Sequence, residues 1–315
     1  MRRGGLAFIA ASVAILIAGY GATAYVANDY YFYAAYIVLQ YVVIATAWNI
    51  LGGYAGYVNF GSAGFYAAGA YSAAILHEWL GAPLPVMIVG GGLVAGAIGL
   101  VAGYLTLRVK GIYFAIATLA LAVVLETIVN NWDYVGGSRG IYVLHPRHVA
   151  GFANYARALF FAMLVLAVGA AVLARFIQHS RLGRGLAAIR DDEQAAESAG
   201  VPTLWLKLFA ATLSGALMGV AGAPFPYYVS HLEPESAFSL AIAVNAIAMP
   251  MIGGATSWIG PILGAVLLGG AQQIATVTIS SIWNLLIVGL LLIGFVIFAP
   301  DGIVGLVRKL TRRRA

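Results

Sequence analysis

Side chains that could catalyse a reaction are scarce in this sequence. Its 315 residues include eleven acids, five histidines and no cysteine, so thiol nucleophiles and thiolate metal sites are excluded. No nucleophile–base set accompanies the histidines, and no Gly-x-x-x-x-Gly-Lys-Ser/Thr sequence is present to hold nucleotide phosphates. The sequence therefore predicts a protein that is not an enzyme and that binds no metal or cofactor itself.

The most polar segment of the chain is 178–205, which holds four of the eleven acids. A short helix fits residues 192–199, because acids favour the first turn of a helix, Gly200 can end it and Pro202 forbids its continuation. The segment therefore predicts one short helix within a polar loop.

The two faces of that helix differ in chemistry. Residues four apart share a face, so Ala195 and Ala199 form a small-residue face, while Glu193 and Glu197 form an acidic one. Such a helix suits docking in a groove of a second protein, although a solvated loop helix carries the same pattern. On the docking hypothesis, Ala196→Arg blocks the partner and leaves the rest of the chain folded.

A second group of polar residues lies within apolar sequence: Asn59, Gly61, Ser62, Thr118 and Asn245. Small hydroxyl and amide side chains let a zwitterion pass without a deep charged trap, and glycines let backbone groups face a path. We predict a substrate path along these residues. Close helix packing through small residues is the alternative for the glycines.

The composition decides the class of protein that must position these groups. Apolar residues make up 62% of the chain and charged residues only 9%, against roughly 25% charged in an average soluble domain. A soluble enzyme, a nucleic-acid binder and a disordered scaffold are excluded, because none could keep so much apolar surface from water. The chain is predicted to be an integral membrane protein that contacts the lipid bilayer and no nucleic acid.

The apolar residues gather in ten runs, which predicts an all-α polytopic fold with about ten transmembrane helices, since the alternating pattern of a membrane barrel is absent. The third run follows a Gly-rich stretch and the eighth is short and contains Pro250, so either helix is open to being broken or re-entrant. The runs are 6–26, 31–51, 60–80, 84–107, 112–132, 155–177, 206–229, 238–252, 258–278 and 282–299.

Basic residues predict the orientation of these spans. With a cytoplasmic amino terminus, ten crossings place fourteen of the seventeen Lys and Arg residues inside, and only Arg139, Arg147 and Arg157 outside. This asymmetry agrees with the positive-inside rule. We therefore predict one transmembrane domain, 1–315, with both termini cytoplasmic, an outer loop at 133–154 and a cytoplasmic loop at 178–205.

Six motifs are ordered along nearly the whole chain. The most telling is Glu193-Gln-Ala-Ala-Glu-Ser-Ala-Gly200 within 185–203. The others lie at 49–71, 110–120, 136–141, 252–261 and 300–305. In their sequence and order these motifs resemble those of branched-chain amino acid ABC transporter permeases of the LivM type.

The resemblance implies a multi-pass permease subunit of the prokaryotic inner membrane. Its implied partners are a homologous second permease, two cytosolic ATPase subunits that bind ATP-Mg, and an extracytoplasmic substrate-binding protein. Glu193, Ala195, Ala196 and Gly200 match the coupling loop of such importers, and Asp192 and Ala199 complete the predicted coupling helix.

Two alternatives stay open. An ion-gradient-driven secondary transporter usually needs ionisable residues at membrane depth, and here only Glu126 lies clearly inside a predicted span. The substrate is also open, because Tyr57, Asn59 and Ser62 stand where many members of the family have Gln, Ser and His. Urea or short amides remain alternatives to branched-chain or related hydrophobic amino acids.

Overall fold

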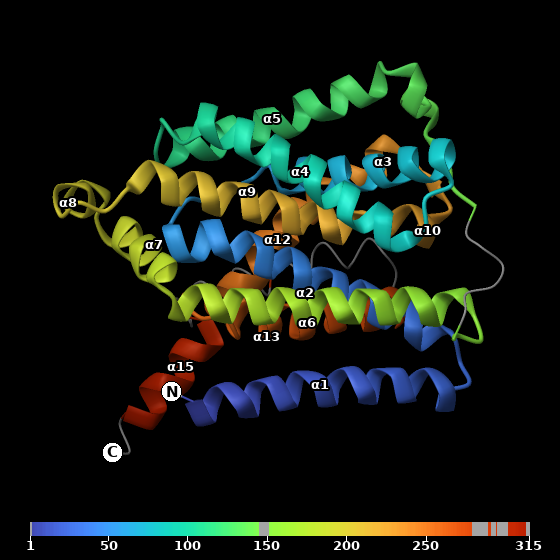
Figure 1. The fold of residues 1–315 in the computed structure, drawn as a ribbon, viewed down its shortest axis with the longest axis horizontal. Coiled ribbons are helices and arrows are strands. Elements are labelled where there is room, and N and C mark those ends of the chain that lie inside the picture. Colours follow the sequence, from blue (N-terminus) through green and yellow to red (C-terminus); the bar gives the residue numbers. More distant parts are fainter. Residues whose placement is uncertain (1, 145–150, 279–288, 291–293, 295–301, 313–315) are drawn as a thin grey trace.

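The computed structural model describes residues 2–144, 151–278, 289–290, 294 and 302–312. Most of them form long helices packed side by side (Figure 1). The helices are α1 (Arg2–Tyr25), α2 (Tyr30–Ala55), α3 (Ser62–Leu80), α4 (Leu84–Thr106), α5 (Ile112–Asn130), α6 (Tyr155–His179), α7 (Arg181–Asp191), α8 (Glu193–Ser198), α9 (Thr203–Gly222), α10 (Phe225–Val229), α11 (Pro234–Ala237), α12 (Leu240–Gly253), α13 (Gly260–Thr278) and α15 (Gly302–Arg312).

The molecule has two distinct ends. Helices α7 and α8 lie at one of them, here named the α8 end, together with the start of α1 and with α15 (Figure 1). The opposite end carries the short 3-10 helices η1 (Asp133–Val135) and η2 (Gly137–Arg139) and a two-residue antiparallel ladder. This ladder pairs β1 (Ile141–Tyr142) with β2 (His231–Leu232) and is the one departure from an all-α fold in the part of the chain that the structure describes.

The predicted spans can be compared with the helices one by one. Each of the first nine predicted ranges overlaps a helix, whereas the tenth, 282–299, lies almost entirely outside the described residues. Seven stretches among the described residues are long and apolar enough to cross a membrane: Ala7–Tyr25, Tyr30–Ala55, Leu84–Thr106, Ile112–Asn130, Tyr155–His179, Thr203–Val229 and Pro234–Gly253. The chain is thus a polytopic helical membrane protein, while the count of ten and the side on which the termini lie stay predictions.

The two doubtful spans can be checked in the same way. The third is one continuous helix, α3, and only the Gly-rich residues 56–61 before it are non-helical. The eighth is also continuous, since α12 runs through Pro250, and the short helix α11 ends just before the predicted range begins. Neither helix is broken within its predicted range, and re-entry of either into the membrane stays a prediction.

Glycines bring α3, α4 and α9 into close contact. A Cβ atom placed on Gly69 would collide with the backbone of Gly219, and one placed on Gly219 would lie 2.6 Å from the carbonyl oxygen of Gly91. Small residues let helix backbones approach in this way in membranes. Gly69, Gly91 and Gly219 therefore allow α3, α4 and α9 to pack closely.

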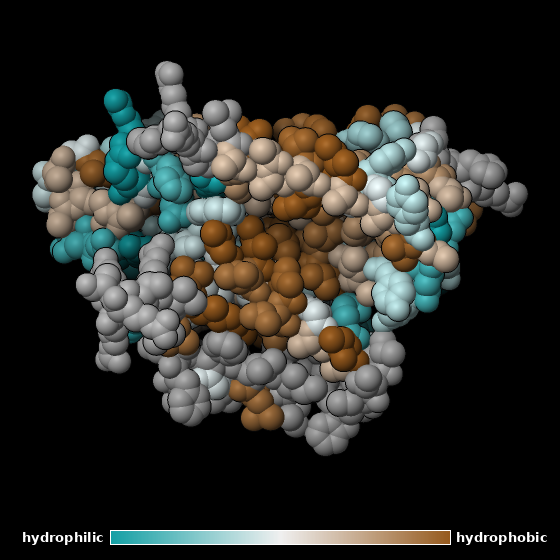
Figure 2. Space-filling view, turned by 90° about the horizontal axis from the view of Figure 1, so that it is seen from below, coloured by the Kyte–Doolittle hydropathy of each residue, from teal (hydrophilic) through white to brown (hydrophobic). Residues whose placement is uncertain are grey.

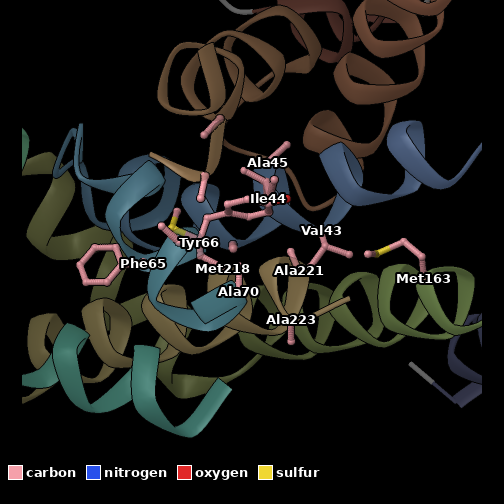
Figure 3. Packing of buried hydrophobic residues seen from close by; sticks show 14 of the residues in the cluster. Val43, Ile44, Ala45, Phe65, Tyr66, Ala70, Met163, Met218, Ala221 and Ala223 are labelled. Carbon is pink, nitrogen blue, oxygen red and sulfur yellow. The ribbon is translucent and has the colours of Figure 1, made fainter. Parts of the chain in front are cut away.

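The hydrophobic core lies between α2, α3, α6 and α9. Figure 3 shows Ile44 of α2, Tyr66 of α3, Met163 of α6 and Met218 of α9 within one buried cluster. Figure 2 shows hydrophobic residues across the middle of one face and hydrophilic residues toward the two ends. This banded surface is what a bilayer requires of a spanning protein.

At the opposite end, the link from α1 to α2 is fastened to α6. Arg157 pairs with Asp29 at 3.1 Å and donates to the backbone carbonyl of Thr23 at 2.7 Å. Asn154 donates to the same Asp29 carboxylate at 2.6 Å. These bonds hold the turn between α1 and α2 against the start of α6.

Candidate functional site

Helix α7 forms the first half of the polar segment. Ser180 caps its start by accepting a hydrogen bond from the backbone N–H of Gly183 at 3.3 Å. Its apolar residues Leu182, Leu186 and Ile189 recur on one helix face, and the last two are buried. The sequence prediction missed α7, although this periodicity was the signal that reveals it.

Helix α8 starts at a side-chain cap. Asp192 has extended backbone angles, and its carboxylate accepts hydrogen bonds from the backbone N–H groups of Gln194 at 2.9 Å and Ala195 at 3.1 Å. These donors would otherwise lack partners in the first turn of the helix. Asp192 therefore fixes where α8 begins.

The other end of α8 is closed by a left-handed residue. Gly200 has φ +82°, and its N–H donates to the carbonyl of Glu197 at 2.9 Å, while Val201 donates to the carbonyl of Ala196 at 3.0 Å. This pair of bonds is the Schellman pattern, which favours glycine at the left-handed position. The predicted helix at 192–199, with Gly200 as its end, is confirmed.

Burial separates Ala196 from the small-residue face of α8. Ala195 and Ala199 are exposed, but Ala196 is only 5% exposed and belongs to a buried cluster with Ile189 of α7 and Leu206 of α9. This burial argues against the expectation that Ala196→Arg leaves the fold intact, because α8 packs on its own chain through this side chain. Any partner of α8 has Ala195 and Ala199 available instead.

The first acid of α8 points into the protein. The two carboxylate oxygens of Glu193 lie 2.6 Å from Nζ of Lys207 and 2.8 Å from Nζ of Lys110, and the hydroxyl of Tyr57 donates to the second oxygen at 2.7 Å. We name these four residues the Glu193 cluster. The expected acidic face is thus split, since Glu197 is exposed and Glu193 is turned inward.

Lys207 is the most deeply buried charge of this cluster, with 5% of its surface exposed. Besides Glu193, its ammonium group lies 3.4 Å from the carbonyl oxygen of Leu107 and 3.4 Å from the hydroxyl of Tyr57. A buried cation is tolerated only with such partners. Glu193 is therefore required to neutralise Lys207 inside the fold.

Electrostatics keep Glu193 ionised. Burial alone would raise the pKa of its carboxyl group, but hydrogen bonds from Lys110, Lys207 and Tyr57 outweigh burial and lower that pKa to about 2. Burial, and next the neighbouring Glu193 carboxylate, raise the pKa of Tyr57 above its ordinary value. At neutral pH Glu193 is therefore a carboxylate and Tyr57 a neutral phenol.

A groove of about 460 Å³ borders the exposed side of α8. Its walls come from α7, from the end of α8 and from the start of α9, and its surface is mostly apolar with two arginines. The lining residues are Arg181, Leu182, Arg184, Gly185, Ala188, Ala199, Gly200, Val201, Pro202 and Leu206. The predicted coupling residues Ala199 and Gly200 thus form part of a surface hollow.

Four of the five predicted path residues lie together. The side-chain oxygen of Asn59 accepts from the backbone N–H of Gly61 at 2.7 Å, and the Thr118 hydroxyl oxygen accepts from the N–H of Phe60 at 3.1 Å. Ser62 is fully buried beside Asn59. These contacts join the start of α3 to α5, so the polar atoms hold helices in place.

Asn245 belongs to another place in the fold. Its amide donates to the hydroxyl of Tyr41 at 3.3 Å, and its carbonyl oxygen accepts from Gln272 at 2.9 Å. Asn245 and Gln272 are each about 95% buried, on α12 and α13. The five predicted path residues therefore form two separate polar groups. Whether either meets substrate stays a prediction.

Comparison with known proteins identifies the family. The family model described as "Branched-chain amino acid transport system / permease component" matches residues 30–296. The chain belongs to this family. No solved structure matches the chain.

Named relatives show how broad this family is. The chain is 29% identical over 300 residues to the high-affinity branched-chain amino acid transport system permease protein LivM of Salmonella typhimurium, covering 87% of this chain and 70% of LivM. It is 24% identical to the probable branched-chain amino acid transport permease protein LivH of Methanocaldococcus jannaschii, covering 81% of this chain and 85% of LivH. It is 26% identical to the autoinducer 2 import system permease protein LsrC of Yersinia pseudotuberculosis, covering 66% of this chain and 62% of LsrC.

The family and the helices together define the class of protein. The chain is a LivM-type transport permease, a multi-pass protein of the prokaryotic inner membrane.

Tyr57 and Lys207 were not predicted as coupling residues. Tyr57 stood out as a departure from the family pattern, but its place under α8 required the tertiary structure.

Proposed function

We propose that this chain is one of two permease subunits of an ATP-driven ABC importer for branched-chain or related hydrophobic amino acids. It supplies half of the path and pairs with a homologous second permease. Two cytosolic ATPase subunits bind ATP-Mg, and an extracytoplasmic protein delivers the substrate. Family membership supports this proposal, and so does the fact that the sequence contains no phosphate-binding loop of its own.

The observation that carries the coupling role is the construction of α8. It is capped at both ends, packed inward through Ala196, and exposed along Ala195 and Ala199 beside an apolar groove. A six-residue helix has little stability alone, so the two caps and the packing of Ala196 are what hold it in a definite position. A fixed, exposed helix next to a groove suits contact with a moving ATPase subunit.

The substrate proposal rests on the relatives. LivM and LivH are named for branched-chain amino acids, and LsrC for autoinducer 2, so the family includes more than one substrate. Urea and short amides remain alternatives within the same importer class. Tyr57 no longer argues for them, because its hydroxyl bonds Glu193.

Co-purification tests the proposal. The chain is expressed with its second permease and tagged ATPase subunits, and Ala199→Trp is compared with wild type and with Ala14→Trp on the exposed surface of α1. We expect Ala199→Trp to release the ATPase subunits and abolish uptake, while Ala14→Trp retains both. Equal recovery with Ala199→Trp would contradict docking at this face.

The importer class has its own test. The chain alone, reconstituted in liposomes, is expected to accumulate no leucine under ATP, a proton gradient or a sodium gradient. The complete assembly is expected to accumulate leucine only with ATP and the binding protein. Gradient-driven uptake by the chain alone would establish a secondary transporter instead.

A further inference from the structure

We propose that Glu193 is a positioning residue that ties α8 to the α2–α3 segment and the α4–α5 turn, so that a displacement of α8 moves the starts of α3 and α5. The source of the displacement, an ATPase subunit, rests on the proposed function. The inward tie itself rests on contacts within this chain.

Glu193 anchors α8 to the rest of the chain. One carboxylate on α8 holds three donors from three other segments: Lys207 at the start of α9, Lys110 in the α4–α5 turn and Tyr57 in the α2–α3 segment. The Glu193 side chain is only 12% exposed. Its oxygens are already engaged, so a partner protein could bind Glu193 only by breaking this cluster.

Hydrogen bonds connect the segment that follows Tyr57 to the start of α3 and to α5. Two residues beyond Tyr57, the backbone carbonyl of Asn59 accepts a bond from the indole of Trp48 at 2.8 Å. The backbone N–H of Phe60 donates a hydrogen bond to the hydroxyl of Thr118 in α5, and Gly61 is the last residue before α3. The segment is short and bonded along its length, so it cannot absorb a shift of Tyr57 without moving its neighbours.

A second tie supports the first. Arg190, at the end of α7, donates from its guanidinium group to the backbone carbonyl of Gly53 at 3.3 Å. A Cβ atom on Gly56, which has φ +79°, would lie 3.0 Å from the side chain of the same arginine. The end of α2 is therefore also fastened to the end of α7 through Arg190.

The buried ion pair between Glu193 and Lys207 also stabilises the fold. A double variant separates this stabilising role from the proposed positioning role. Removing one partner leaves an unpaired buried charge, whereas removing both charges often restores stability. Lys207→Met, Glu193→Gln and the double variant are therefore compared in the complete assembly. The readouts are folded yield, co-purified ATPase subunits, and leucine taken up per ATP hydrolysed.

We expect each single variant to lower the folded yield, and the double variant to recover it together with the ATPase subunits. Uptake per ATP in the double variant should still fall at least tenfold. If the double variant keeps uptake per ATP within twofold of wild type, the cluster is merely structural and the inference is wrong.

A milder variant keeps the inference testable if the double variant does not fold. Tyr57→Phe removes one hydroxyl and keeps the ring contact with Phe114, at 5.2 Å between centroids. Tyr54→Phe is the matched control, since its buried hydroxyl bonds Ala174 outside the cluster. We expect uptake per ATP to fall severalfold in Tyr57→Phe alone, and an unchanged ratio would overturn the inference.

These readouts also separate the inference from the proposed function. If wild type retains no ATPase subunit, the proposed function fails and the inference falls with it. If the subunits bind every variant and uptake per ATP never changes, only the inference fails.

Discussion

Helix α8 and the segment 59–62 are both built from small and polar residues, yet they use them in opposite ways. Ala195 and Ala199 of α8 face solvent, whereas Asn59 and Ser62 are 2% and 0% exposed. The polar atoms of the segment bond to its own backbone, while α8 keeps its outer face for other contacts. Similar residue types thus form an exposed face in one place and a buried structural joint in the other.

The inner side of α8 sharpens this contrast. There the helix is packed through Ala196 and held by the charges of the Glu193 cluster. An α8 that were merely a solvated loop helix would need neither contact. Substitutions in the two regions should therefore differ in effect as their burial differs.

The first prediction concerns Ala196→Arg, which introduces a charge and a long side chain at a 5% exposed position. Burying an unpaired charge and overfilling a packed site each cost energy, so we expect destabilisation by several kcal/mol. The measurement is the melting temperature and monodisperse yield in detergent. Ala195→Arg, one residue away and exposed, is the control and should melt like wild type. Equal melting of both variants would mean that α8 does not pack on the chain.

The second prediction concerns Asn59→Ala. This change leaves the buried N–H of Gly61 without its acceptor, which costs about 1–3 kcal/mol. The control is Asn28→Ala, since Asn28 makes the same bond to a residue two positions on, Tyr30, but is exposed. That control should shift stability by no more than ~0.5 kcal/mol.

Transport separates the two roles of Asn59. A structural joint predicts lower stability with unchanged selectivity among leucine, isoleucine and valine in uptake assays. A change in selectivity without loss of stability would restore Asn59 to the substrate path and erase the contrast with α8.

The regions also differ in how far the sequence alone predicts them. Asp192, Gly200 and Pro202 act on backbone within a few residues, so their pattern predicted α8 almost to the residue. Nine of the ten apolar runs likewise overlap a helix of the described residues, because a helix that crosses the bilayer must be apolar along its length. Local signals therefore sufficed for α8 and for these runs, whereas the equally local periodicity of α7 was missed.

The remaining features depend on residues far apart in the chain. Tyr57 lies 136 positions from Glu193, and Lys207 lies 150 positions from Tyr57, so no local pattern joins them. The burial of Ala196 likewise depends on where α7 and α9 pack. Asn245 was grouped with Asn59 by chemistry alone, and the structure separates them because α12 packs against α13 and α2.

The third prediction concerns the end of α8. Gly200 has φ +82°, and a Cβ atom added to it would have no neighbour within 4 Å, so Gly200→Ala meets a conformational penalty and no collision. A left-handed alanine costs about 1–2 kcal/mol, and the melting temperature should fall slightly. Gly169→Ala, inside α6 with equally open space, is the control and should be neutral or slightly stabilising. A fall of the same size in both variants would argue against the left-handed end of α8.

The smallest effect is expected from pH, and it tests the charges beneath α8. Glu193 has its pKa lowered from 4.5 to about 2, so its stabilising contribution is complete above pH 4.5 and is lost as pH falls toward 2. The raised pKa of Tyr57 has the opposite sign, since its contribution is complete below pH 10 and is lost at higher pH. The difference in melting temperature between wild type and Glu193→Gln should therefore be constant from about pH 5 to pH 9. At about pH 3 the difference should shrink to roughly half or less, because the unfolded chain already binds a proton at Glu193 below pH 4.5 and folding must then remove it. A difference that titrates near pH 6 instead would show that another ionisable group holds α8, and the Glu193 cluster would not be what separates this helix from the buried segment 59–62.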